Sequence, residues 1–102
     1  MIENYETSKQ AILEQIALAK KKNKSSVKVM VYQLETTKQG KLKKMFLRSG
    51  FSEGGEGCEE LKKMGYSLSY EKFDKQVTER IVKNVPILSV KKMNTTNLII
   101  KW

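Results

Sequence analysis

Valine at every second position from 27 to 31 is the feature that most constrains how this chain folds. A period of two in β-branched residues is typical of a β-strand, because successive side chains of a strand point to opposite faces. The positions on the other face are not polar, since Met30, Tyr32 and Leu34 are large and apolar. The sequence therefore predicts either a sheet that is covered twice or one with a face that receives a partner.

A second run, residues 42–47, follows the polar segment 36–40, which ends in Gly40. Two such runs joined by about five residues with a glycine are typical of a β-hairpin. We therefore expect a hairpin near 27–48.

An amphipathic helix is predicted at about 7–22. Thr7 and Gln10 have the spacing of a capping box, and Ile12 and Ile16 follow at helical spacing. Several lysines crowd the end of this segment, where positive charge suits the helix dipole.

The chain from 49 to 57 is rich in glycine and breaks both periods, which predicts a loop. Cys58, Leu61 and Met64 then recur every three residues, and Gly65 stands where a helix often ends. We expect a short helix in this region.

A longer helix is predicted at 70–84. It rests on one apolar stripe at helical spacing, which consists of Tyr70, Phe73, Val77, Ile81 and Val85. Two Glu–Lys pairs four residues apart support this helix, and Pro86 ends it. Residues 66–73 also alternate in polarity, so a strand over that segment remains the main alternative.

Residues 87–102 predict a second hairpin with its turn at 94–97. The whole chain, 1–102, is therefore expected to be a single α+β domain in the order α-β-β-α-α-β-β. Its four-stranded antiparallel sheet, built from the two hairpins, carries the helices on one face as a two-layer domain. The expected core contains Ile12, Ile16, Val29, Val31, Phe73, Val77, Ile81, Leu98 and Ile100.

The residue types present exclude much catalytic chemistry. The chain has no histidine and one cysteine, Cys58, which rules out Ser–His–Asp triads, Cys–His pairs and histidine-containing zinc sites within one chain. Cys58 at a helix start has the position of an activated thiolate, but a buried role is favoured because no histidine can act as its base. The glycines at 54–57 lack the spacing of a phosphate-binding loop and have glutamates around them, so a connector is favoured. We expect a protein that is not an enzyme and takes no cofactor or metal.

Basic charge gives the function its only direction. The chain carries 20 Lys and Arg against 11 Asp and Glu, a net charge of +9, and its only arginines are Arg48 and Arg80. Lysine supplies point charge to phosphates, whereas arginine is favoured for reading bases. The charge therefore indicates nucleic acid, single-stranded or duplex, bound with low sequence specificity. Codon bias in an AT-rich genome also produces a composition rich in lysine and poor in arginine, so the charge alone does not establish a partner.

The predicted nucleic-acid site combines basic and aromatic residues of the two hairpins on an open sheet face. It consists of Lys28, Tyr32, Lys38, Lys41, Lys43, Lys44, Phe46, Arg48, Lys91, Lys92 and Lys101. Lys28 and Tyr32 are expected to point outward from the sheet, beside Lys44, Phe46 and Arg48.

Two functions follow from these patterns. The first is a small nucleic-acid-binding accessory protein. The alternative is a protein–protein adaptor or inhibitor, of the kind carried by mobile elements, that docks on an acidic surface through an apolar strand face or a free sheet edge. The same apolar face can equally form a homodimer seam. Apolar runs of membrane length and a signal-peptide pattern are missing from the sequence, so we expect a soluble cytoplasmic protein without membrane contact.

Overall fold

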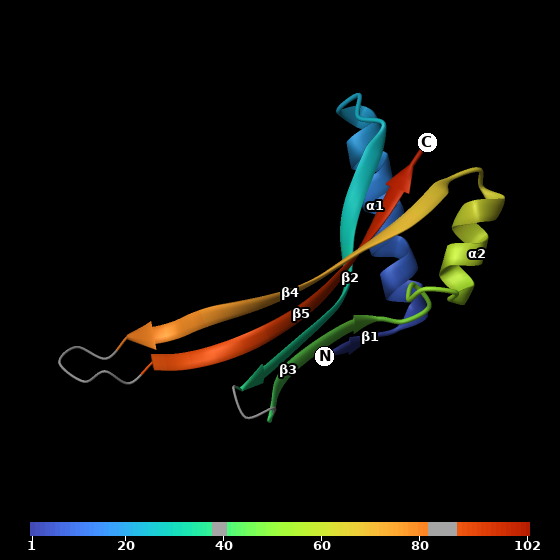
Figure 1. Ribbon diagram of the computed structural model, residues 1–102. Coiled ribbons are helices and arrows are strands. Elements are labelled where there is room, and N and C mark those ends of the chain that lie inside the picture. Colours follow the sequence, from blue (N-terminus) through green and yellow to red (C-terminus); the bar gives the residue numbers. More distant parts are fainter. Residues whose placement is uncertain (38–40, 82–87) are drawn as a thin grey trace.

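The computed structural model describes residues 1–37, 41–81 and 88–102, with side chains outside 77–91 (Figure 1). Its elements are β1 (Ile2–Glu3), α1 (Tyr5–Lys21), β2 (Ser26–Thr37), β3 (Leu42–Arg48), α2 (Glu56–Lys63), β4 (Ser67–Ile81) and β5 (Leu88–Lys101). The strands form one five-stranded sheet in the order β1-β3-β2-β5-β4. β1 pairs with β3 in parallel, and every other pairing is antiparallel. The α+β class is confirmed, whereas the four-stranded, purely antiparallel sheet and the α-β-β-α-α-β-β order are wrong.

The first helix lies close to its predicted range of 7–22 but begins two residues earlier, at Tyr5. Asn4 is its N-cap, and the Asn4 side chain accepts a hydrogen bond from the Thr7 backbone N–H at 2.8 Å. This bond satisfies one of the free N–H groups at the helix start. Thr7 is therefore inside the first turn, and the predicted capping box is wrong.

The first hairpin, predicted near 27–48, is confirmed as β2 and β3. The short helix predicted after the glycine-rich loop is confirmed as α2, and Gly65 follows its end with φ +94°. A left-handed conformation of this kind suits glycine, which has no Cβ to clash with the backbone.

The helix predicted at 70–84 is wrong, because residues 67–81 form β4 and pair with β5 from Ser67 to Ile81. The alternating pattern, in which Leu68 and Tyr70 alternate with Ser67, Ser69 and Glu71, predicts the observed strand, and the helical stripe does not. Two Glu–Lys pairs contribute only a few tenths of a kcal/mol each to a helix, less than a long ladder of backbone hydrogen bonds with cross-strand side-chain contacts. Phe73 is 42% exposed and lies outside the core.

The turn predicted at 94–97 is also wrong, since β5 runs unbroken from Leu88 to Lys101. It pairs with β2 on one side and β4 on the other, which makes it a central strand. Thr95 and Asn97 are buried there, at 7% and 9% exposure. The Asn–Thr–Thr–Asn sequence looks like a turn in isolation, but threonine also suits a pleated strand.

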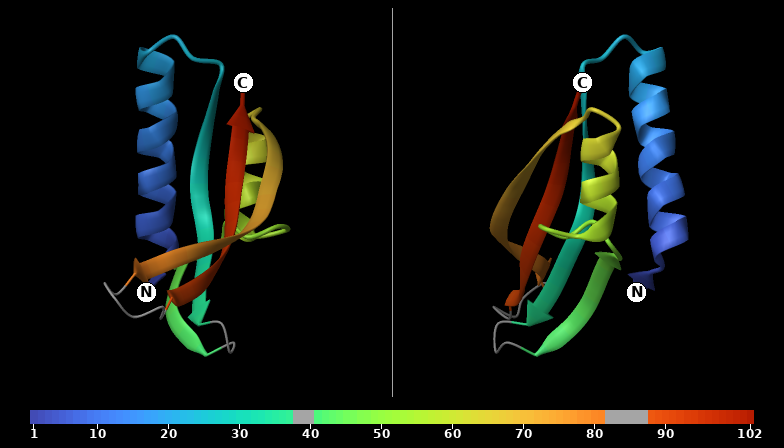
Figure 2. Two further views of the ribbon diagram at one scale, coloured as in Figure 1. Left: turned by 60° about the vertical axis from the view of Figure 1, so that its left-hand side comes forward. Right: turned by 90° about the vertical axis from the view of Figure 1, so that its right-hand side faces the viewer.

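Both helices pack against one face of the sheet, and the core lies between them and that face (Figure 2). The buried cluster consists of Ile12, Ile16, Val29, Val31, Phe51, Leu61, Leu98 and Ile100. Six of the nine predicted core residues are confirmed by this cluster. Phe51 comes from the glycine-rich loop and Leu61 from α2, and neither was predicted. The side chains of Val77 and Ile81, like residues Val85 and Pro86, lie outside the described part.

The molecule is elongated, with principal extents of 55 × 27 × 20 Å. Figure 1 shows the cause, since β2, β3, β4 and β5 all continue past the helices, and the paired strands β4 and β5 reach furthest. Within the described ranges, no helix has the length and apolar character needed to cross a membrane.

Candidate nucleic-acid interface

The sheet face opposite the helices carries a row of side chains that crosses four strands. The register places Phe46 of β3 beside Gln33 of β2, Gln33 beside Thr95 of β5, and Thr95 beside Phe73 of β4. The Gln33 side-chain amide donates to the Thr95 hydroxyl at 3.3 Å, which confirms that these two share a face. We call this surface the outer face, defined by Phe46, Gln33, Thr95, Phe73 and the residues that alternate with them on the same side.

The two phenylalanines mark the two sides of this row. Phe73 is exposed and Phe46 is half-buried. They are three strand spacings apart, about 14 Å, so a single base cannot touch both rings. The side chains of Gln33 and Thr95 between them are polar.

Five basic residues share the outer face with this row, as the strand alternation shows: Lys28, Lys44, Arg48, Lys75 and Lys101. Lys75 lies opposite Met93 of β5, and Lys101 is eight residues further along β5. The basic residues therefore extend over about 26 Å of strand length. Four of the five were predicted site residues, and Lys75 was not.

Two of these cations already have acidic partners. Lys28 pairs with Glu71 at 3.0 Å, and Arg48 pairs with Glu3. The Arg48 Nε also donates to the Met30 carbonyl at 2.9 Å, and its guanidinium lies 5.2 Å from the centre of the Phe46 ring. Arg48 therefore links β1, β2 and β3 at this end of β3. Because Lys28 and Arg48 are paired with acidic residues, the outer face has less positive charge available for a ligand than the sequence suggests.

Tyr32 does not lie on the outer face, contrary to the prediction. The β2–β5 register passes from Met30 opposite Asn97 directly to Tyr32 opposite Thr96, so Val31 is an extra residue, a β-bulge. A bulge shifts the alternation by one residue and moves every later side chain to the other face. Lys28 and Met30 precede the bulge and stay outward, whereas Tyr32 turns to the helix side.

The remaining predicted residues are dispersed. Lys92 lies on the helix-side face of β5, the same face as Asn94 two positions along the strand. Lys41 lies just before β3, and its backbone N–H donates to the Thr37 hydroxyl at 3.1 Å. Lys43 is the extra residue of a second bulge, where Thr36 pairs with Leu42. Lys38 and the Lys91 side chain lie outside the described part of the chain.

Phe73 is the aromatic residue that sequence reasoning missed for this face. It was assigned to the core of the helix predicted at 70–84. The alternation of residues 66–73, which favoured a strand, was the signal that could have found it: Leu68 and Tyr70 face the core, so Phe73 falls on the opposite side.

The glycine-rich loop is fixed in place rather than open for a phosphate. The N–H of Gly57 donates to the Gly50 carbonyl at 2.8 Å, and that of Gly55 donates to the Ser52 carbonyl at 2.8 Å. These N–H groups are therefore used within the loop, which supports its interpretation as a connector.

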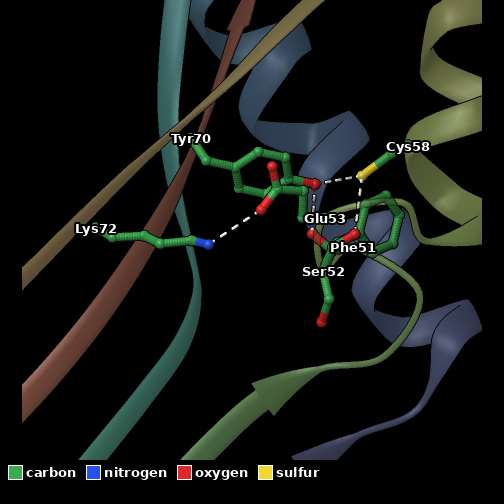
Figure 3. Close-up of polar contacts among 6 residues, drawn as sticks. All are labelled: Phe51, Ser52, Glu53, Cys58, Tyr70 and Lys72. Atoms are coloured by element: carbon green, nitrogen blue, oxygen red, sulfur yellow. Dashed lines mark hydrogen bonds and ion pairs between the residues drawn. The ribbon is translucent and has the colours of Figure 1, made fainter.

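A small polar cluster holds the same loop against β4 (Figure 3). The Tyr70 hydroxyl donates to the Phe51 carbonyl at 3.0 Å and lies 2.7 Å from the Cys58 sulfur. Lys72, two residues further on the same face of β4, pairs with Glu53 at 3.0 Å. Burial, together with the Cys58 contact, raises the pKa of Tyr70 above its ordinary value. Cys58 is buried, as expected, with polar contacts that the prediction did not include.

The part of the chain with described side chains holds no cluster of three or more Cys, Asp or Glu residues suited to a metal ion. No protein-family model, curated protein or solved structure matches this chain.

Proposed function

We propose that this protein is a small, non-enzymatic nucleic-acid-binding protein that takes up single strands on the outer face of its sheet. The observation that carries this proposal is the row from Phe46 to Phe73 with lysines on the same face. Unpaired bases stack on aromatic side chains, and nearby lysines neutralise the phosphates. Duplex nucleic acid offers no free base faces to the rings, so single strands are favoured.

The proposed binding should have low sequence specificity. Arg48 is the only arginine on the described outer face, and it is occupied by Glu3 and the Met30 carbonyl. Lysine and phenylalanine contact phosphates and base planes, which do not distinguish one sequence from another. We expect oligonucleotides of equal length to bind within about tenfold of one another, less than a good bidentate base contact discriminates.

The test is a fluorescence-anisotropy titration with single-stranded and duplex oligonucleotides at two salt concentrations. Phe73→Ala should weaken single-strand binding by about 1–3 kcal/mol, the contribution of one stacked base. Tyr32→Ala is the matched control, because it removes an aromatic ring from the opposite face. Equal losses in the two variants, or no binding to any oligonucleotide at low salt, would refute the proposal.

A second candidate function is the adaptor that docks on an acidic protein surface. It is favoured by a separate observation, an unpaired edge of β2 beside a groove rimmed with lysines.

A further inference from the structure

β2 has a strand on both sides for only part of its length. β5 pairs with it from Ser26 to Thr37, whereas β3 pairs with it only from Tyr32 to Thr36. On the β3 side, residues 26–30 have no neighbouring strand within the described chain. An edge of this kind presents unpaired N–H and C=O groups that can hydrogen-bond to a strand of another chain.

The bond from Arg48 shows which backbone groups face the open side. Arg48 ends β3, and its Nε donates to the Met30 carbonyl at 2.9 Å. The Met30 carbonyl therefore points away from β5. Because backbone direction alternates along a strand, the N–H and C=O groups of Ser26 and Lys28 point to the open side with those of Met30.

A groove of about 370 Å³ lies beside this edge, between β2 and the C-terminal half of α1. Figure 2 shows α1 running alongside β2. Leu18, Ala19 and Val27 give the groove an apolar wall, and Leu18 is 46% exposed. The volume falls within the usual range of ligand sites and has room for a few side chains.

The charge of the groove has one sign. Lys22, Lys24 and Lys28 line it, and no acidic residue is among the described residues that do so. Lys28 is paired with Glu71, whereas Lys22 and Lys24 are exposed at the end of α1. A ligand that fits this rim carries negative charge at the α1 end.

We propose that an extended acidic peptide segment of a partner protein binds here by adding a strand to residues 26–30. Its backbone would pair with Ser26 and Lys28, up to the Met30 carbonyl that Arg48 already holds, and an apolar side chain would enter the groove against Leu18. Its carboxylates would meet the lysines at the end of α1. Strand addition of this kind takes its affinity from backbone bonds and its specificity from side-chain pockets. The inference rests on the adaptor function and is independent of the nucleic-acid proposal.

Two other occupants fit less well. A second copy paired antiparallel about the middle of this edge would set Lys28 opposite Lys28, and like charges directly opposite each other are destabilising. A nucleic-acid backbone offers phosphate acceptors for the N–H groups but no amide donors at the spacing of the alternating carbonyls. An acidic peptide supplies both backbone groups and the complementary charge.

The probe is a blocked seven-residue peptide of alternating valine and glutamate, titrated into isotope-labelled protein and followed by NMR amide shifts. We expect shifts centred on residues 26–30 and on the end of α1, and none at Phe73. A peptide of alternating valine and lysine, of the same length, should bind at least about tenfold more weakly, because the rim is cationic.

Lys28→Pro is the sharpest variant, because it removes an N–H that faces the open side and no bond to β5. Proline is tolerated at such edge positions, so the fold should be retained. We expect at least about fivefold weaker binding of the acidic peptide than in Lys28→Ala, which loses the same charge. The double change Lys22→Ala, Lys24→Ala should also weaken binding several-fold, and it keeps the test open if the proline variant does not fold.

Four results would overturn the inference: no shift at residues 26–30, equal binding of the lysine peptide, equal affinity of Lys28→Pro and Lys28→Ala, or an oligonucleotide that shifts this edge when the acidic peptide does not. Self-association that Lys28→Pro abolishes would assign the edge to a second copy instead. Phe73→Ala separates the two proposals, since it should reduce oligonucleotide binding and leave peptide binding unchanged.

Discussion

The Tyr70 hydroxyl helps to join the glycine-rich loop to the sheet. It donates to the Phe51 carbonyl and contacts the Cys58 sulfur. Phe51 is among the largest fully buried side chains, and it packs in the core from a segment with no regular structure. A single hydroxyl thus helps to hold a core side chain that no strand or helix positions.

We predict that Tyr70→Phe destabilises the fold by about 1–2 kcal/mol, because the Phe51 carbonyl then loses its donor. Urea unfolding at neutral pH measures this difference. Tyr32→Phe, which removes a hydroxyl outside this cluster, is the matched control and should change the free energy of unfolding by less.

The difference in stability between the wild type and Tyr70→Phe should also depend on pH. The pKa of Tyr70 is raised in the fold, so the neutral phenol favours the native state. This contribution is fully present below the unfolded tyrosine pKa of about 10 and is lost as the pH rises above it. The stability difference between the wild type and Tyr70→Phe should therefore shrink between pH 8 and pH 11. A difference that grows over this range would contradict the assignment.

The sequence predicts a helix or a strand well where the local period and the burial of its residues agree. The helix near 7–22 and the hairpin near 27–48 carry one period each, and both are confirmed. Residues 70–84 fit two periods at once, and the pairing with β5 decides between them. A helical stripe cannot reveal that a long partner strand is available elsewhere in the chain.

The candidate site was predictable only in part for a related reason. Lys28, Lys44, Phe46, Arg48 and Lys101 lie on one face as strand alternation predicts. Tyr32 does not, because the bulge at Val31 is set by pairing with β5 rather than by any local signal. β1 was also missed, since two residues beside β3 are too short to show a period.

Truncating a side chain on each face of β5 should change the free energy of unfolding by different amounts. Leu98 is fully buried on the sheet face that the two helices cover. Its neighbour Ile99 is half-buried on the outer face. Leu98→Ala should cost about 2–5 kcal/mol, the usual range for a core leucine, whereas Ile99→Ala should cost less than about 1.5 kcal/mol because it removes less buried surface. Chemical denaturation measures both, and comparable losses would contradict the placement of the core.

For the whole molecule, the net charge of +9 does not by itself indicate where nucleic acid would bind. Salt bridges use several of the cations: Lys9 pairs with Glu60, and Lys62 with Glu59. The proposed binding surface is instead specified by which cations share a face with Phe46 and Phe73. That face has no covering helix in the described structure.

Lys75 and Lys92 test this placement, because they are exposed lysines near each other on paired strands but on opposite faces. Lys75→Ala should reduce the slope of log affinity against log salt by about 0.7 for single strands, the value for one phosphate contact. Lys92→Ala should leave that slope unchanged. Anisotropy titrations at several salt concentrations give both slopes, and equal slopes would place the nucleic acid elsewhere.

Binding of single-stranded nucleic acid to the outer face, as we propose it, can be tested residue by residue. The most direct measurement is an NMR titration of the isotope-labelled protein with a short single-stranded oligonucleotide at low salt. We expect the largest shifts at Gln33, Phe46, Phe73 and Thr95, with the ring resonances of the two phenylalanines moving upfield as bases stack on them. Shifts confined to the helices or to the end of α1, with those four residues unmoved, would contradict it.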